Sequence, residues 1–384
     1  MTAAEILREL VAIATPSSIS NLPLLHWVHD FLKPLGWHLE WMKWTDESGV
    51  AKANLLAFAG HGADATDPAS IDLAFICHTD TVPYAPAWST ALTLEERDGD
   101  LHGCGSCDVK GALACFLSAA ASTGISHLHR RIGMILTADE EVGCKGMERF
   151  LASDRYRNLH IRSAIVSEPT SLRAGIAGKG YGLARIIVQG HEAHSAFPSQ
   201  GHSAITAASR LITQIEDKFS EQSSDENSDT STLFDPPRTT INIGVIQGGS
   251  AKNIIAGECT FLVEWRSLPG EPHGSVITAL YQLCQAAEQA QPAIRMHLEP
   301  VRDEPGFAPA HAGQLQHQLQ KLLPAAPTGI SFGSEASRLA RIADEIIVIG
   351  PGDMRTAHSE RECVPASELE TWTSVLIDLL QRKD

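Results

Sequence analysis

Short, continuous apolar runs recur along the chain and are separated by segments with helical or polar patterns. Runs of this length, bounded by turn residues, are typical of strands that are buried on both faces. The sequence predicts four of them, at residues 73–76, 132–137, 164–167 and 346–349. Because helical patterns lie between these runs, we expect an α/β fold with a mostly parallel central sheet flanked by helices.

The pattern changes near residue 180, where apolar and polar positions begin to alternate. Alternation is typical of antiparallel strands with one buried face, and it predicts strands at 181–189, 240–246, 258–265 and 293–298. Two helices are predicted between them, at 201–219 and 274–290. We therefore expect a smaller α+β domain at 180–300, inserted into a larger domain formed by 1–179 and 301–384. The polar segment 220–237 is predicted to be a mobile loop.

Two predicted helices begin with the spacing of a capping box, in which a hydroxyl and a carboxylate each accept a backbone N–H. Thr2 with Glu5 begins the first helix of the chain, and Ser367 with Glu370 begins the last. We expect each pair to cap the N-terminus of its helix.

Composition and charge exclude several classes of function. The chain has 384 residues, of which 43% are hydrophobic, so it can bury the cores of two domains and is not a disordered protein. Its formal charge of -16 argues against binding to nucleic acid or to an anionic membrane. No apolar run approaches the roughly 20 residues that a membrane span requires, and no signal peptide is recognisable. We therefore expect a cytoplasmic protein rather than a secreted or membrane-bound one.

The 8 cysteines are expected to be free thiols in a reducing compartment. Cys104 and Cys107 form a C-x-x-C pair without a second pair, which is weak evidence for zinc or redox chemistry. Small buried apolar residues are the simpler interpretation of these two cysteines.

Ionisable side chains follow three of the predicted strands. His78 and Asp80 come after the first, Glu140 and Glu141 after the second, and Glu168 after the third. The carboxyl ends of neighbouring parallel strands meet at one edge of a sheet, where α/β proteins bind their ligands. Adjacent carboxylates repel one another unless a cation lies among them. A metal site explains the pattern, although a core histidine and a solvated acidic turn are the alternatives.

Two further residues extend this set. Asp108 stands just before the predicted helix at 112–121, where it could bind metal or merely cap the helix. His358 follows the strand at 346–349. Two imidazoles and three carboxylates suit two zinc-like ions with one bridging carboxylate, and Zn²⁺, Co²⁺ and Mn²⁺ all accept such ligands. The candidate ligands are His78, Asp108, Glu141, Glu168 and His358.

A series of motifs resembles a known family. In chain order they are H-T-D-T-V-P at 78–83, G-x-G-x-x-D-x-K-G at 103–111, T-A-D-E-E at 137–141, S-E-P-T at 167–170, G-H-x-x-H-S-A-x-P at 190–198 and G-P-G…A-H-x-x-x-E at 350–362. The chain is similar to the di-zinc amidohydrolase family of acetylornithine deacetylase, succinyl-diaminopimelate desuccinylase, aminoacylase and carboxypeptidase G. Within that family the likeness to the acetylornithine deacetylases is greatest. Cys104 departs from the family pattern, which usually has arginine there.

The resemblance implies a role for each residue at the edge of the sheet. His78 and Glu168 would hold one metal ion, and Glu141 and His358 would hold the other. Asp108 would bridge the two ions. Asp80 would orient the His78 ring, and Glu140 would act as the general base.

The resemblance also implies residues that bind the substrate and a partner subunit. The family forms homodimers through the inserted domain, and His194 would reach the partner's active site to stabilise an oxyanion. Asn253 and Arg266 would bind the substrate carboxylate, and Lys179 is a further candidate for substrate binding. Glu335 either pairs with a cationic substrate side chain or only holds its own loop.

The expected activity is hydrolysis of the amide bond of a small N-acyl amino acid. N-acetyl-L-ornithine, cleaved to L-ornithine and acetate in arginine biosynthesis, is the first candidate substrate. A desuccinylase, an acetylcitrulline deacetylase and a broader aminoacylase are alternatives. A metal-binding homologue without catalytic activity is a different kind of alternative, against which the intact Glu140 argues.

Overall fold

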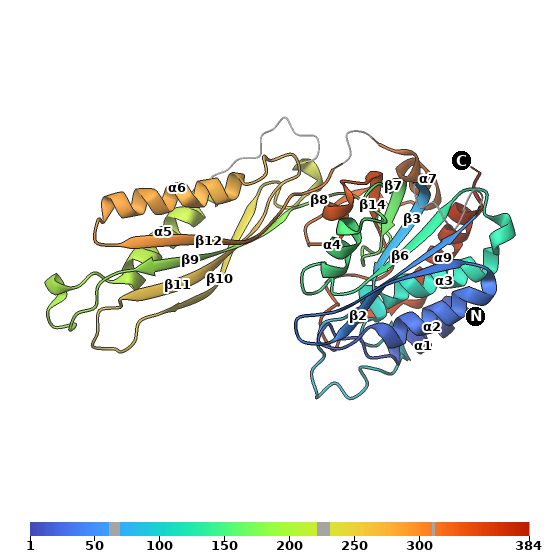
Figure 1. Ribbon diagram of the computed structural model, residues 1–384, viewed down its shortest axis with the longest axis horizontal. Helices are drawn as coiled ribbons and strands as arrows, with labels where there is room; N and C mark the ends of the chain where they lie inside the picture. The colour runs from blue at the N-terminus through green and yellow to red at the C-terminus, as the bar shows by residue number, and fades with distance from the viewer. Residues whose placement is uncertain (61–69, 221–230, 309–311, 384) are drawn as a thin grey trace. The chain divides into compact units, whose positions relative to one another are not determined.

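The computed structural model describes residues 1–60, 70–220, 231–308 and 312–383 (Figure 1). The chain divides into two units. Unit 1 comprises Met1–Ile176, Pro309–Thr328 and Ser334–Asp384, and unit 2 comprises Ala177–Ala308 and Gly329–Gly333. Unit 2 thus includes residues 177–179, 301–308 and 329–333, which the sequence analysis assigned to the larger domain.

An eight-stranded mixed sheet has the strand order β1-β2-β6-β3-β7-β14-β8-β13, and the first six strands in this order lie in unit 1. Strands β6, β3, β7 and β14 are parallel, whereas β1, β2 and β8 pair antiparallel with their neighbours. The predicted α/β class is confirmed, with a sheet that is parallel at its centre and antiparallel toward its edges. The bounds are β1 His38–Thr45, β2 Ala51–Ala59, β3 Ser70–His78, β6 Ile132–Thr137, β7 His160–Val166, β8 Gly175–Gly178, β13 Thr328–Ile330 and β14 Ala343–Val348.

The helices of unit 1 cover the central strands (Figure 1). Helix α3 contacts α1, α9 and β3, so it is buried over most of its length. Phe116 on α3 stacks on Phe75 of β3, with ring centroids 4.4 Å apart. The bounds are α1 Ala3–Val11, α2 Leu22–Leu32, α3 Gly111–Thr123, α4 Lys145–Ala152, α7 Gln314–Leu322, α8 Ala336–Leu339 and α9 Ala366–Gln381.

One of the two predicted capping boxes is present. The Thr2 hydroxyl accepts the N–H of Glu5, and the Glu5 carboxylate accepts the N–H of Thr2. The second box is wrong, because α9 begins after Pro365 and has no side-chain cap. Strand β15, Cys363–Pro365, leads directly into α9, so Ser367 already lies within the first helical turn.

Unit 2 contains an antiparallel sheet with the strand order β10-β11-β9-β12 and two long helices, as the sequence predicted. One face of the sheet, including Ile186 of β9 and Phe261 of β11, forms an apolar core with Leu211 of α5 and Leu280 of α6. Residues 221–230 of the polar segment lie outside the described residues. The bounds are β9 Tyr181–Gln189, α5 Ala204–Ser220, β10 Thr240–Gly248, β11 Glu258–Arg266, α6 Ser275–Ala290 and β12 Arg295–Glu304.

Unit 1 also contains a small sheet with the strand order β15-β5-β4, in which β4 is Glu95–Arg97 and β5 is Asp100–His102. This sheet places residues just before the glycine-rich turn beside residues just after His358. Of the helices among the described residues, none has the length and apolar character needed to cross a membrane.

Candidate functional site

The predicted ligands follow strands whose carboxyl ends lie side by side. His78 is the last residue of β3 and is in register with Thr137, the last residue of β6. Ile76 of β3 is in register with Val166, the last residue of β7. The segments that follow these three strands therefore begin at the same edge of the sheet, as the parallel order requires.

Asp108 joins the two histidines of the site. Its Oδ1 lies 3.1 Å from Nε2 of His78, and its Oδ2 lies 3.1 Å from Nε2 of His358. Asp108 is in the turn Ser106–Lys110 before α3, and its peptide bond to Val109 is cis. The N-cap position of α3 is Lys110, and no side chain caps this helix. Capping is therefore excluded as the role of Asp108.

Two groups of potential metal ligands share the Asp108 carboxylate. The ligand atoms within each group lie within 4.8 Å of one another. The structure thus brings together all five predicted ligands, in the same two sets that the family resemblance implies. The first group is His78, Asp108 and Glu168, and the second is Asp108, Glu141 and His358.

The ring of His78 is oriented for binding through one nitrogen. Its Nδ1 lies 3.0 Å from the backbone oxygen of Asp80. Because a carbonyl oxygen accepts, Nδ1 carries a proton, which leaves Nε2 as the nitrogen available to a metal. Nε2 in turn faces Asp108, so a proton or a cation must separate these two groups.

The charges of the site favour a bound cation. Burial raises the pKa of Glu168 well above its usual range, and the nearby carboxylates of Asp108 and Glu140 raise it further. Burial also raises the pKa of Glu140 to about 8, and the charge of Glu141 acts in the same direction. Burial and the neighbouring carboxylates thus disfavour the charged forms of Glu140 and Glu168, and two divalent ions would offset this effect. The donor set of oxygen and nitrogen atoms fits such ions.

The Asp80 carboxylate contacts the acidic turn more closely than it contacts His78. It accepts the Ser17 hydroxyl at 2.7 Å and the backbone N–H groups of Glu140 and Glu141 at 3.0 and 3.2 Å. Its Oδ1 is 3.7 Å from Nδ1 of His78. Asp80 thus meets the ring through its backbone oxygen, and its carboxylate fixes the turn that carries the predicted base.

A buried ion pair, which sequence reasoning missed, supports the same turn. The ammonium of Lys52 on β2 lies 2.6 Å from Asp139 Oδ1 and 2.6 Å from the backbone oxygen of Ser17. Both charged side chains are almost fully buried. The available signal was a lysine in a strand that is otherwise apolar except for Asn54, because a buried charge requires a partner.

Glu362 holds the turn that carries Asp108. Its carboxylate accepts the backbone N–H groups of Gly105, Cys107 and Asp108 at 3.0, 3.1 and 3.0 Å. Burial raises the pKa of Glu362 to about 7, although these hydrogen bonds oppose the shift. In the sequence, Glu362 stands out only as the last residue of a motif. Its contact with the Asp108 turn could not be predicted, because the two segments are far apart in the chain.

Glu335 is a buried carboxylate in unit 1. It occupies the N-cap position of α8, but its side chain makes no capping hydrogen bond. Its Oε1 has no hydrogen-bond partner among the described residues. Burial raises the pKa of Glu335 to about 7, although the charge of His78 lowers it. One of its two oxygens is therefore open to a further donor.

His194 and Asn253 lie on adjacent segments of unit 2. The N–H of Ser195 donates to the backbone oxygen of Asn253, and His194 forms a bridge with Ile254. Both His194 and Asn253 are exposed. The Nδ1 of His194 accepts the N–H of Ala196 at 3.1 Å, which leaves Nε2 free to carry a proton.

Arg266 and Lys179, also in unit 2, already have partners. The Arg266 guanidinium lies 4.2 Å from the Tyr181 ring centroid and 2.7 Å from Glu264 Oε1. The Lys179 ammonium donates to the backbone oxygens of Pro236 and Arg238 at 3.0 and 2.7 Å. A substrate carboxylate at Arg266 would share the guanidinium with Glu264.

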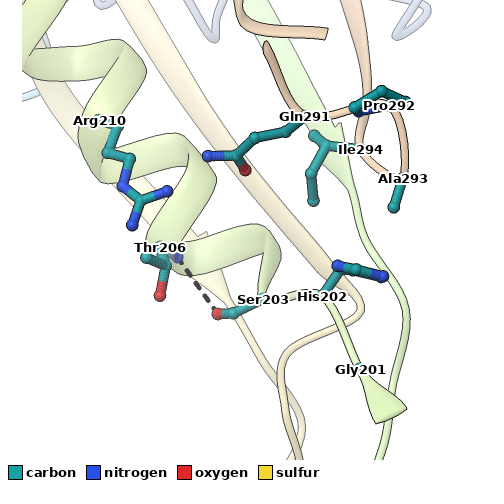
Figure 2. A pocket seen from close by; sticks show the side chains of 9 residues that line it. All are labelled: Gly201, His202, Ser203, Thr206, Arg210, Gln291, Pro292, Ala293 and Ile294. Carbon is teal, nitrogen blue, oxygen red and sulfur yellow. Dashed lines mark hydrogen bonds between the residues drawn. The ribbon is translucent and has the colours of Figure 1, made fainter. Parts of the chain in front are cut away.

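Of two cavities, one is lined by a predicted metal ligand and the other by no predicted site residue. One in unit 1, of about 320 Å³, is lined by Ser17, Asp139 and Glu141 among others, so it reaches the second ligand group. Another in unit 2, of about 390 Å³, lies between the start of α5 and the segment after α6. Figure 2 shows Thr206 and Arg210 on its helical side, and no predicted site residue lines it.

All eight cysteines are free thiols. Cys104 and Cys107 are buried, and burial raises the pKa of both thiols. Neither belongs to a group of metal ligands among the described residues.

The chain is similar in sequence to a known family and to a named relative. The model of peptidase family M20/M25/M40 matches residues 74–382. A protein from Myxococcus xanthus named acetylornithine deacetylase is 40% identical over 373 residues, which are 96% of this chain and 94% of that protein.

Two solved structures share the fold. A tripeptidase from Staphylococcus aureus has a TM-score of 0.77 at 20% sequence identity. The match covers 99% of this chain and 97% of the tripeptidase chain. A dinuclear metal-binding peptidase of the M20 family from Bacillus subtilis has a TM-score of 0.69 at 12% sequence identity. This match covers 99% of this chain and 96% of the peptidase chain.

The three hydrogen bonds of Glu362 predict a large effect of its substitution. Glu362→Gln replaces one acceptor oxygen with an NH₂ group that faces backbone donors, so the free energy of unfolding should fall by about 2 kcal/mol or more. Urea unfolding of the metal-free protein measures this loss. Glu360→Gln, an exposed change two residues away, should stay within about 0.5 kcal/mol of wild type. Equal stability of the two variants would contradict the role of Glu362.

Proposed function

This chain belongs to peptidase family M20/M25/M40 and is a metal-dependent amidohydrolase, and from this premise we propose that it removes the acyl group from N-acyl amino acids, with N-acetyl-L-ornithine as its substrate. The family predicted from the motifs is thereby confirmed. The shared carboxylate of Asp108, placed between two ligand groups, is the observation that carries the proposal of a hydrolytic site. The similarity to a protein named acetylornithine deacetylase supports the choice of substrate.

We assign one divalent metal ion to His78 and Glu168 and another to Glu141 and His358, with Asp108 shared between them. When bound, the two ions supply Lewis-acid polarisation of the amide carbonyl and acidify a water molecule. Zn²⁺ is the proposed metal, because imidazole and carboxylate ligands suit it, and Co²⁺ or Mn²⁺ would also fit.

Glu140 is the proposed proton carrier. It accepts a proton from the attacking water and donates it to the amine nitrogen as the amide C–N bond breaks, so that acetate and the free amino acid are released. The Glu140 carboxyl is half-buried and is not among the assigned metal ligands, so it can accept and return a proton. The Asp80 carboxylate contributes by holding the N–H of Glu140 in place.

His194 is the proposed donor to the oxyanion, supplied by the partner subunit of a homodimer. Its Nε2 is free to donate, because its Nδ1 accepts the N–H of Ala196. The edge strand β10 offers a surface for the dimer, since edge strands carry unpaired backbone groups. Val245 and Ile246 on this strand are 47% and 51% exposed. Unit 2 would thus serve both dimerisation and catalysis.

Arg266 and Asn253 are the proposed contacts of the substrate α-carboxylate, because a guanidinium binds a carboxylate through two parallel hydrogen bonds. Glu335 is the proposed partner of the ornithine ammonium, since its Oε1 is open to a donor. Lys179 remains a predicted substrate-binding residue whose ammonium would have to leave two backbone oxygens. The proposed product links the enzyme to arginine biosynthesis in the cytoplasm, where free thiols are expected.

The alternatives differ in the acyl group and the side chain of the substrate. A desuccinylase would prefer a succinyl amide, and an acetylcitrulline deacetylase would prefer a neutral side chain. An aminoacylase would accept many side chains, and a homologue without activity would release no amine at all. A panel of N-acyl amino acids, assayed for released amine together with metal content, separates these four outcomes.

Glu140→Gln should lower kcat by about a thousandfold, because the amide cannot take up the proton of the attacking water. Metal content, measured by elemental analysis, should remain that of wild type, since Glu140 is not among the assigned ligands. Glu148→Gln, an exposed change on α4, is the matched control and should keep normal activity. Turnover of Glu140→Gln close to that of wild type would refute the assignment of the base.

Glu335→Gln should lower kcat/KM for N-acetyl-L-ornithine by about 10- to 100-fold more than for N-acetyl-L-methionine. A hydrogen bond to a charged partner is worth about 1.5–3 kcal/mol, and only the first substrate carries a side-chain ammonium. Comparing two substrates with one variant cancels any general damage to the site. Equal losses for both substrates would show that Glu335 does not recognise the cation.

Sedimentation velocity should show a species of two chains, and Val245→Glu should shift it toward one chain. A charge on each copy at the centre of an apolar contact cannot be solvated once the contact forms. Val301→Glu provides the control, because Val301 is 57% exposed on the opposite edge strand, β12. The proposed interface would be wrong if Val301→Glu dissociated the dimer and Val245→Glu did not.

A further inference from the structure

A third group of potential metal ligands lies in unit 1, on the small sheet β15-β5-β4. It consists of Asp100 and His102 on β5 and Cys363 on β15, and their ligand atoms lie within 4.8 Å of one another. None of these residues has a role in the proposed reaction. The group contains sulfur, nitrogen and oxygen donors, whereas the other two groups contain only nitrogen and oxygen.

The pairing of the two strands explains why these side chains meet. His102 and Cys363 are directly opposite each other in the antiparallel pair of β5 and β15. Opposite residues in such a pair point to the same face of the sheet. Asp100 precedes His102 by two residues on β5, so it also points to that face. Backbone hydrogen bonds therefore fix the positions from which all three donors extend.

The three donors have few competing partners. The Asp100 carboxylate lies 4.0 Å from the Cys363 thiol, which is itself a member of the group. Neither Asp100 nor His102 forms an ion pair within the described part of the chain. Glu95 is opposite His102 on the other neighbouring strand, but it is paired with Arg97. The donors are thus available to a cation.

The three residues are also accessible from solvent. Asp100, His102 and Cys363 are all half-buried. Cys363 is in this respect unlike the other seven cysteines of the chain, which are buried. A metal ion can therefore reach this thiol without opening the core.

The chemistry of the donors selects a class of metal. Thiolate and imidazole ligands suit Zn²⁺ and Co²⁺, and they are poor ligands for Mg²⁺ and Ca²⁺. With bonds of about 2.0–2.3 Å, a tetrahedral zinc site has neighbouring ligand atoms about 3.3–3.8 Å apart. Since the donor atoms lie within 4.8 Å of one another, they would have to approach by at most about 1.5 Å, which rotation of the side chains can supply. A water molecule would complete four ligands.

We propose that Asp100, His102 and Cys363 form an additional binding site for one thiophilic divalent metal ion, with Zn²⁺ as the expected occupant. The site is separate from the proposed dinuclear centre and goes beyond the proposed function. It connects two strands that lead to the Asp108 turn, since Glu362 directly precedes Cys363 and the turn follows His102. Binding should therefore stabilise this part of unit 1.

Binding of Co²⁺ to the proposed site gives a spectroscopic signal that the dinuclear centre cannot give. Titration of the metal-free protein with Co²⁺ should produce a near-ultraviolet thiolate-to-cobalt charge-transfer band, because only the new site contains sulfur. Equilibrium dialysis should give three Co²⁺ ions per chain. Cys363→Ser should abolish the band and leave two ions. His102→Ala should weaken Co²⁺ binding at this site at least tenfold.

Cys284→Ser, a buried change in unit 2, is the matched control and should keep both the band and three ions. Deacylase activity is measured in parallel and should be unchanged in Cys363→Ser. A wild-type protein with no charge-transfer band, or a band that survives Cys363→Ser, would overturn the proposal. Loss of the proposed deacylase activity with an intact band would instead count against the function and leave this site standing.

Discussion

The Asp108 carboxylate between two imidazoles is the contact on which the site depends. His78 ends a central strand and His358 lies in a loop near the end of the chain, and each lies 3.1 Å from one oxygen of Asp108. Among the residues that the structure describes, no other belongs to both ligand groups of this site. A shift of Asp108 would therefore disturb both groups at once, whereas a shift of Glu168 or Glu141 would disturb only one.

Buried carboxylates hold this arrangement by accepting backbone N–H groups. Glu362 accepts three of them from the turn of Asp108, and Asp80 accepts two from the turn of Glu140 and Glu141. A backbone N–H cannot rotate away as a side-chain donor can. The carboxylates thus convert flexible glycine-rich and acidic turns into fixed supports for the ligands. The ion pair of Lys52 and Asp139 also supports the acidic turn, because the Lys52 ammonium joins Asp139 to the backbone oxygen of Ser17.

The central strands could be predicted, and the five candidate ligands could be expected at one edge of the sheet, because their signals are local. An apolar run that ends in His78 or Glu168 contains both the strand and the group that follows it. The supporting contacts could not be predicted in this way, since Glu362 and the turn it holds are far apart in the sequence. The second capping box failed for a related reason. Ser367 has the right spacing, but strand β15 determines where α9 begins.

The position of His358 and Glu362 near the end of the chain has a consequence for synthesis. Strands β3, β6 and β7 leave the ribosome long before the loop after β14, because synthesis runs from the N-terminus. A growing chain therefore contains Asp108, Glu141 and Glu168 but lacks one imidazole and the support of the Asp108 turn. Both ligand groups can assemble only after residues 358–362 have been synthesised. A chain that stops before His358 therefore carries the first ligand group but not the second.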